Sequence, residues 1–187
     1  MSTLRHQMAN LVSVPITLMY LVSKKIFYPN GIYFSAVERF SPGVIIDLDR
    51  KSKIKFGKRV SIHSGGRISA NSGGELVIKD NVSFNVGCIV ICKKRVSIGR
   101  NVCFGPNVMI YDHDHIIGAD DGVKSMGFRI GEVVIEDNAW IGAGTIILRN
   151  THIGKNCVIA AGSVVKGNVP DGTILIQKRE SEYRKFE

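Results

Sequence analysis

Two histidines separated by a single residue are the most reactive feature of this sequence. They are His113 and His115, in the run Ile110-Tyr111-Asp112-His113-Asp114-His115. An imidazole titrates near neutral pH, so each histidine is a candidate general base for removing a proton from a hydroxyl group. Residues i and i+2 of a strand point to the same side, and their positions therefore do not choose between the two histidines.

The same run supports two other interpretations. Asp and His side chains of a solvated loop can simply hydrogen-bond to one another. Alternating Asp and His side chains can also bind a metal ion, with His63 and His152 as further candidate ligands. Those two histidines do not stand at a spacing typical of a ligand set, so we expect no metal.

The histidines open a Gly-rich, charged segment, residues 111–132, which interrupts a six-residue repeat. After the interruption an aliphatic residue recurs at every sixth position, at Ile135, Ile141, Ile147, Ile153, Ile159 and Val165. The fifth position of each unit is small or compact, at Ala139, Thr145, Thr151, Cys157, Ser163 and Val169. Long excursions from a regular scaffold are usually functional.

A period of six fits neither an α-helix nor a plain hairpin alternation. It fits a chain wound into triangular coils, in which each unit is a short strand with a turn and three units close one coil. Stacked coils then bury a continuous aliphatic column. Earlier positions also lie six apart, at Ile54, Val60, Gly66, Ser72, Ile78, Phe84 and Val90, and the pattern resumes two residues out of phase at Ile98, Phe104 and Ile110. The sequence predicts an all-β parallel β-helix.

Composition narrows the range of partners. The chain has 187 residues and a formal net charge of +9, which favours an anionic partner such as a phosphorylated cofactor or an anionic lipid surface. We expect no nucleic-acid partner, because the sequence contains no aromatic-basic motif or known nucleic-acid module. The cysteines show no zinc-binding spacing, which favours small buried side chains in a reducing compartment (Cys88, Cys92, Cys103 and Cys157).

Residues 1–42 differ from the repeats. The apolar run from Leu11 to Val22 is too short to span a membrane, contains Pro15 and is followed by Lys24 and Lys25. The pattern favours a helix that caps the β-helix. An alternative is an interfacial helix that touches a membrane through residues 11–25. The predicted organisation is an N-terminal segment 1–42, a β-helix domain 43–176 with the extended loop 111–132, and a basic tail 177–187.

With these patterns in view, the chain resembles the hexapeptide-repeat acyltransferases. The resemblance covers about residues 76–172, through the runs NVSFNVGCIVI, IGRNVCFGPNVMIYDHDH, VVIEDNAWIGAGTIIL and IGKNCVIAAGSVVKGNVP. It is greatest to the maltose, galactoside, nodulation-factor and polysaccharide O-acetyltransferases. The resemblance implies a left-handed parallel β-helix and a homotrimer that holds acetyl-CoA, the acyl donor, between neighbouring subunits.

The resemblance also implies roles for individual residues. The family's base opens the long loop in a segment like Ile-Tyr-x-x-x-His, which favours His115 over His113. Asn85 matches an asparagine that lies beside the acceptor, although an asparagine in a left-handed turn would explain it equally well. Trp140 borders the acetyl-CoA site in this comparison, and the Ala143 N–H stabilises the oxyanion.

Further residues are implied to bind acetyl-CoA. Gly142 is expected to let the pantetheine arm approach, and the turn after the next strand to line the cofactor. Lys178 and Arg179 would meet the CoA phosphates, although the chain departs there from the family's usual terminal turn. The full predicted set is Trp140, Gly142, Ala143, Ala160, Ala161, Gly162, Lys166, Lys178 and Arg179.

We therefore predict an acetyl-CoA-dependent O-acetyltransferase that modifies a sugar hydroxyl of a surface polysaccharide or its precursor by direct transfer. The expected location is cytoplasmic, at the inner face of the membrane, because the apolar, basic N-terminus suits a glycan built on a lipid carrier. Three alternatives remain open: an N-acetyltransferase of an amino nucleotide-sugar, a metal-dependent hydratase, and a non-enzymatic trimeric scaffold.

Overall fold

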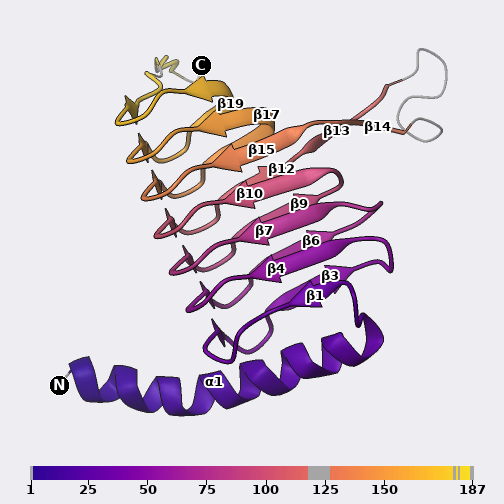
Figure 1. Cartoon of the computed structure of the whole chain (residues 1–187). Helices are drawn as coiled ribbons and strands as arrows, with labels where there is room; N and C mark the ends of the chain where they lie inside the picture. Colours follow the sequence, from indigo (N-terminus) through magenta and orange to yellow (C-terminus); the bar gives the residue numbers. More distant parts are fainter. Residues whose placement is uncertain (1, 118–126, 179, 181, 186–187) are drawn as a thin grey trace.

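The computed structural model describes residues 2–117, 127–178, 180 and 182–185, with side chains from residue 12 onward. It shows a prism of stacked coils with one helix across its N-terminal end (Figure 1). The chain passes in turn along three faces, numbered 1 to 3, and the edges are named by the faces they join. In every pair of neighbouring coils the strands are parallel and in register. The prediction of an all-β parallel β-helix is confirmed.

The strands sort by face. Face 1 contains β1 (Ile32–Tyr33), β4 (Lys53–Phe56), β7 (Glu75–Ile78), β10 (Arg95–Ile98) and β15 (Glu132–Ile135). Face 2 contains β2 (Arg39–Phe40), β5 (Ser61–Ile62), β8 (Ser83–Phe84), β11 (Cys103–Phe104), β16 (Trp140–Ile141), β18 (Val158–Ile159) and β20 (Ile174–Leu175). Face 3 contains β3 (Ile45–Leu48), β6 (Arg67–Ala70), β9 (Ile89–Cys92) and β12 (Met109–Tyr111). Two longer strands, β17 (Ile146–Ile153) and β19 (Val164–Val169), run from face 3 around to face 1.

The predicted aliphatic column is the core of the upper coils. All six aliphatic positions from Ile135 to Val165 are at most 2% exposed, and the small fifth positions from Ala139 to Val169 are also buried. The shift of two residues before Ile98 is confirmed as well, because Ile98 stands in register with Ile78.

The phase predicted for the lower coils was wrong. Phe56, Ile62 and Ile68 stand in register with Ile78, Phe84 and Val90 and form the lower part of the column. Gly66 and Ser72 lie at corners instead, and Ser72 is exposed with a φ of 60°. Extra residues at the corner between β6 and β7 lengthen that coil, so a strict count of six loses the true phase.

An asparagine ladder runs up the 1–2 edge. Each member has a positive φ, and each side-chain amide donates to the carbonyl oxygen of the next at 2.9–3.0 Å (Asn81, Asn101, Asn138 and Asn156). Asparagine adopts the left-handed conformation more readily than other residues with a Cβ. The turn interpretation therefore holds for this edge.

The N-terminal helix α1 (Ser2–Phe27) closes the end of the prism, as the cap interpretation predicted. Leu21 is fully buried, the Phe40 N–H donates to Thr17 Oγ1 at 2.8 Å, and the Ile46 N–H donates to the Tyr20 hydroxyl at 2.9 Å. The first coil begins at Ile32, ahead of the expected boundary at residue 43, because β1 and β2 are too short to show a repeat. None of the described helical residues forms a stretch long and apolar enough to cross a bilayer.

Candidate active site

The loop after β12 leaves the 3–1 edge as a two-stranded hairpin. Strands β13 (His113–His115) and β14 (Phe128–Ile130) pair antiparallel and project from the prism (Figure 1). Asp112 fixes the root of this hairpin. Its buried carboxylate accepts the backbone N–H groups of Lys93, Lys94 and Arg95 at 2.7–3.0 Å. Its carbonyl oxygen accepts the Gly131 N–H at 2.7 Å, which joins the two ends of the loop.

The two histidines lie on the same side of the hairpin, as the strand alternation predicted. Both rings contact the Phe128 ring, His113 at 5.2 Å and His115 at 4.7 Å between centroids. The ammonium of Lys93 lies 3.9 Å from the same ring. Asp114 points to the other side and pairs with Arg149.

The environments of the histidines differ. The His113 side chain is 10% exposed, and its Nδ1 lies 3.2 Å from the Asp112 carboxylate. His115 is exposed, and within the described part of the chain no hydrogen bond or ion pair engages its ring. The interpretation of local Asp–His hydrogen bonds therefore fits His113. Of the two rings, that of His115 is accessible to a substrate.

The other predicted residues gather on the 2–3 edge. One corner column contains the residues that directly follow β8, β11, β16 and β18, namely Asn85, Gly105, Gly142 and Ala160. They stack on one another because these four strands are in register. Trp140 is 58% exposed, in line with Cys103 and Val158 on face 2. Ala161 and Gly162 form the corner directly above Ala143, whose carbonyl accepts the Gly162 N–H at 2.7 Å.

Asn85 does not follow the asparagines of the 1–2 edge. Its φ is not positive, so the left-handed turn does not explain it. Its side-chain oxygen accepts the Val86 N–H at 2.8 Å. Its amide group is exposed and, in the described residues, donates no hydrogen bond, which leaves it available to an acceptor molecule.

Ala143 presents an N–H group that, among the described residues, has no acceptor. The equivalent corner position one coil below is Pro106. The register follows from the hydrogen bond that the Gly144 N–H donates to the Pro106 carbonyl oxygen at 2.8 Å. Gly142 is buried, and a Cβ there would lie 2.5 Å from the Ala161 nitrogen. Coil stacking therefore requires that this position has no side chain, and its contact with the pantetheine arm stays a prediction.

Lys166 and Lys178 are both exposed and lie on different parts of the prism. Lys166 lies within β19, where that strand passes from face 3 to face 1, and therefore at the 3–1 edge. Lys178 follows Gln177, whose side chain makes two hydrogen bonds with the backbone of Val164 at the top of face 3. Arg179 lies outside the described residues, as does part of the predicted loop.

The structure thus separates the predicted site into two halves. His115 and Lys166 lie on the 3–1 edge, whereas Asn85, Trp140 and Ala143 lie on the 2–3 edge or beside it. The width of face 3, about four residues or about 13 Å, separates the two edges within one chain. Along the axis of the prism the two halves lie at the same height. Asn85 lies one coil below the coil that leads into the hairpin, and Ala143 lies one coil above it.

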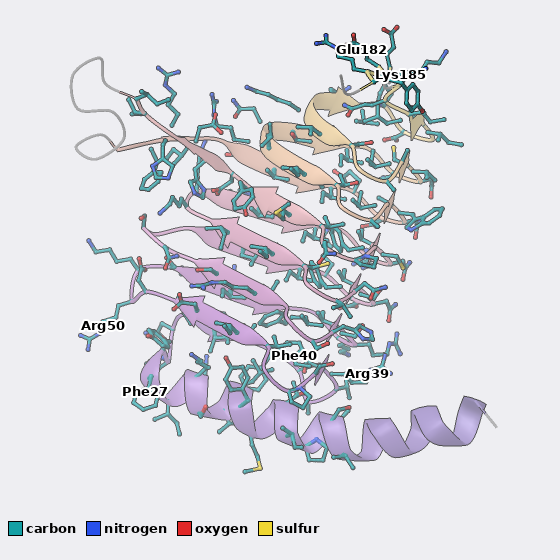
Figure 2. The ribbon with its side chains drawn as sticks, turned by 180° about the vertical axis from the view of Figure 1, so that it is seen from behind. Phe27, Arg39, Phe40, Arg50, Glu182 and Lys185 are labelled. Carbon is teal, nitrogen blue, oxygen red and sulfur yellow. The ribbon has the colours of Figure 1, made fainter. Side chains whose placement is uncertain are left out.

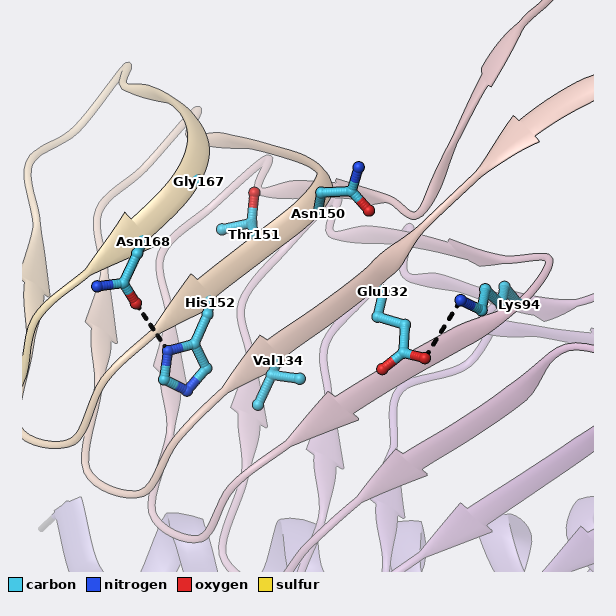
Figure 3. Close-up of a pocket in the computed structure, with 8 residues that line it drawn as sticks. All are labelled: Lys94, Glu132, Val134, Asn150, Thr151, His152, Gly167 and Asn168. Atoms are coloured by element: carbon cyan, nitrogen blue, oxygen red, sulfur yellow. Dashed lines mark hydrogen bonds and ion pairs between the residues drawn. The ribbon is translucent and has the colours of Figure 1, made fainter.

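Two further histidines, His63 and His152, do not join either half. His63 lies at the 2–3 edge one coil below Asn85, and His152 lies on face 1. His152 lines a polar hollow of about 550 Å³, where its Nδ1 lies 2.9 Å from Asn168 Oδ1 (Figure 3). The described residues contain no group of three or more His, Cys, Asp or Glu side chains placed to hold a metal ion.

Comparison with known proteins connects this geometry to a family. Residues 132–167 match the bacterial transferase hexapeptide model, which describes six repeats. This part of the chain carries the hexapeptide repeat. Among solved structures it shares the fold of a point mutant of AntD, an N-acyltransferase from Bacillus cereus in complex with dTDP-4-amino-4,6-dideoxyglucose and coenzyme A. That likeness has a TM-score of 0.64 at 18% identity and covers 87% of this chain and 88% of the other.

Two curated relatives are closer in sequence. The galactoside O-acetyltransferase of Lactococcus lactis is 41% identical over 80 residues, which cover 42% of this chain and 38% of the relative. WbbJ of Escherichia coli, named as an O-acetyltransferase of lipopolysaccharide biosynthesis, is 30% identical over 146 residues, 74% of this chain and 64% of the relative. The chain therefore spans less than two thirds of the length of either protein. These relatives support the sugar O-acetyltransferase branch of the family.

Several residues of the site were not identified from the sequence. They are Asp112, which anchors the hairpin, Phe128, which supports both histidines, and Arg149, which pairs with Asp114. Phe128 stands in the run GFRIGE, where an aromatic residue among glycines was the available signal. Asp112 and Arg149 gave none, because their partners are distant in sequence.

Proposed function

We propose that this protein is an acetyl-CoA-dependent O-acetyltransferase that acts on a sugar hydroxyl of a surface polysaccharide or its precursor. The observation that carries the proposal is the match in height between the two halves of the site. One edge presents an accessible histidine on a projecting hairpin. The other presents an exposed tryptophan, with an amide group and an N–H group that donate no hydrogen bond to the residues that the structure describes.

A closed ring of three chains would unite the halves. If the 3–1 edge of each copy meets the 2–3 edge of the next, His115 of one copy faces Asn85 and Ala143 of its neighbour at the same height. Face 3 supports this arrangement, because its outward positions form an apolar column in register (Ile89, Met109, Ile146 and Val164). Outward positions of face 1 are charged instead, as in the Lys55–Glu75 pair and in Glu132, which pairs with Lys94 of the 3–1 edge.

The chemistry follows from these positions. His115 removes the proton from the acceptor hydroxyl as the oxygen attacks the thioester carbon. The carbonyl oxygen gains negative charge and accepts a hydrogen bond from the Ala143 N–H. The tetrahedral intermediate then collapses, the C–S bond breaks, and His115 returns the proton to the CoA sulfur. Asn85 orients the acceptor hydroxyl through its free amide group.

The donor is held above the reacting atoms. Trp140, Ala160, Ala161 and Gly162 line the 2–3 edge in the coils on the C-terminal side of Asn85. Exposed cations, Lys166 of one copy and Lys178 of its neighbour, suit the phosphates of CoA. Donor and acceptor would therefore approach Ala143 from opposite ends of the edge.

Acetyl-CoA turnover, read as thiol release with sugar and glycan acceptors, tests the proposal. We expect acceptor-dependent release that falls about 10²–10⁴-fold in His115→Ala. His113→Ala is expected to lower thermal stability more than the turnover of folded protein, since its ring packs between Asp112 and Phe128. An acetyl ester product is cleaved by hydroxylamine, whereas an amide product is not and would indicate N-acetylation. Loss of turnover only in His113→Ala would refute the base assignment, and the absence of CoA binding would refute the function.

A further inference from the structure

Helix α1 exposes an apolar surface that capping does not require. Thr17 and Leu21 face the prism and are buried, at 2% and 0% exposure. From residue 12 to residue 27 the opposite side carries apolar residues that are 44–74% exposed, with exposed Ser23 among them, and we call these apolar residues the α1 stripe: Val12, Ile16, Met19, Val22, Ile26 and Phe27. The solvent side of a surface helix is normally polar. The stripe therefore indicates that an apolar surface outside this chain covers α1.

Positive charge lies at the C-terminal end of the stripe. Lys24 and Lys25 stand there, the Lys25 ammonium donates to the Ile32 carbonyl at 2.8 Å, and the segment 2–27 contains no acidic residue. Lys24 and Arg50 line a hollow of about 380 Å³ together with Phe27. Within the described residues no acidic side chain forms an ion pair with Arg50. Phe27 lies on the helix, and Arg50 projects sideways from the corner of a coil near it (Figure 2).

We propose that the α1 stripe docks this protein on an anionic lipid bilayer, and that the acceptor is a glycan still attached to its lipid. An apolar helix face bordered by basic side chains is the pattern of helices that lie in a membrane interface. The same charges disfavour a second copy as the occupant, since two identical cationic surfaces repel each other. In a ring with its axis along the prism, all three α1 helices lie at one end and present their stripes in one plane.

A groove leads from the stripe to the 2–3 edge. It has a volume of about 560 Å³, and Val12 and Ile16 form its α1 side. Phe40, Pro42 and Ile62 supply further apolar lining, with Arg39 beside them. The groove marks a path along the surface from the docked side of α1 to the corner column.

The groove ends at the acceptor side of the candidate site. His63 lines the groove and lies directly below Asn85 in the corner column. Asn85 stands two coils above β2, so it lies about 20 Å from the outer surface of α1, taking one helix diameter and two strand spacings. A single sugar on a docked lipid would not reach it. This part of the inference rests on the proposed acetyl transfer, and it assigns the acceptor to lipid-linked oligosaccharides.

Vesicle co-sedimentation tests the docking without acetyl-CoA. Wild-type protein is expected to pellet with vesicles of phosphatidylcholine and phosphatidylglycerol, and less with phosphatidylcholine alone or at high salt. Met19→Glu/Ile26→Glu is expected to bind at least about tenfold more weakly, because it places two carboxylates in the interface. Both positions are exposed, so the fold should persist, which circular dichroism checks. Ile174→Glu, at an equally exposed position on the last coil of face 2, is the matched control and should bind like wild type.

Three results would overturn the docking: no wild-type binding, equal binding by the double variant, or a doubled particle mass that the double variant halves. The last would identify a second copy as the occupant.

For the acceptor, thiol release is compared between a polyprenyl-diphosphate-linked oligosaccharide in vesicles and the same oligosaccharide released by mild acid. A KM at least about tenfold lower for the lipid-linked form is expected, and equal KM values would overturn the acceptor assignment. Release with neither form would contradict the proposed function, and vesicle binding would still decide the docking.

Discussion

At the scale of single residues, the decisive groups are a histidine and a backbone N–H that make no hydrogen bond within the described part of the chain. His113 and His115 are equivalent in the sequence, and only the packing distinguishes them. Asp112 and Phe128 hold His113 in place, whereas His115 is exposed. A buried carboxylate that accepts three backbone N–H groups is a rigid anchor, so the hairpin leaves the prism in a defined direction.

The Ala143 N–H offers a precise probe of oxyanion stabilisation. Ala143→Pro removes this donor, and the Gly105-Pro106 pair one coil below shows that the corner accepts proline after glycine. We predict a fall in kcat of about 10²–10³-fold with the fold retained. The matched control is Ser64→Pro, at the equivalent corner outside the site, which should keep wild-type turnover. Unchanged turnover in Ala143→Pro would exclude this amide from the reaction.

Thiol reactivity is a second prediction at this scale. Burial raises the pKa of the Cys88 thiol, and burial beside Asp112 raises the pKa of the Cys92 thiol further. A raised pKa keeps a thiol protonated and unreactive at neutral pH. Exposed Cys103 departs from the expectation of buried cysteines and should react first with a maleimide. Mass spectrometry of the native protein checks this, and equal labelling of Cys88 would contradict the packing.

At the scale of elements, the cap depends on hydrogen bonds that no repeat pattern reveals. Thr17 Oγ1 accepts the Phe40 N–H at 2.8 Å and donates to the Ser13 carbonyl at 2.7 Å. Thr17→Val would leave a buried N–H without a partner. We predict a loss of about 1–3 kcal/mol in the free energy of unfolding.

Thermal melts at one protein concentration measure this loss. Thr173→Val is the control, because the Thr173 hydroxyl makes a single bond of 3.4 Å near the surface, and it should melt like wild type. Equal melting of Thr17→Val and wild type would show that water replaces the lost acceptor.

Much of the fold was predictable at this scale, and the reason is periodicity. The upper coils repeat at six residues without insertions, so every inward position from Ile135 to Val165 was identified. The lower coils carry extra corner residues, so the phase was wrong at Gly66 and Ser72. The positive φ of Asn101, Asn138 and Asn156 followed from residue type, whereas the exception at Asn85 required coordinates.

At the scale of the whole molecule, the candidate site is incomplete in one chain. Sequence likeness could name His115, Asn85 and Ala143 but could not show that they lie on different edges of a prism. That separation depends on the packing of the coils and makes oligomerisation part of the proposed mechanism. The expected particle mass is three times the 20.5 kDa chain, and Ile146→Asp on face 3 should reduce the mass and the turnover together.

Mixed oligomers test the shared site most directly. His115→Ala and Ala143→Pro each disable one half, and the halves belong to different chains in the proposed ring. When equal amounts are unfolded together and refolded, random assembly should restore about one quarter of wild-type thiol release, because one interface in four pairs an intact His115 with an intact Ala143. Each variant refolded alone should remain inactive. No restoration in a mixture that forms trimers of wild-type mass would contradict a site shared between chains.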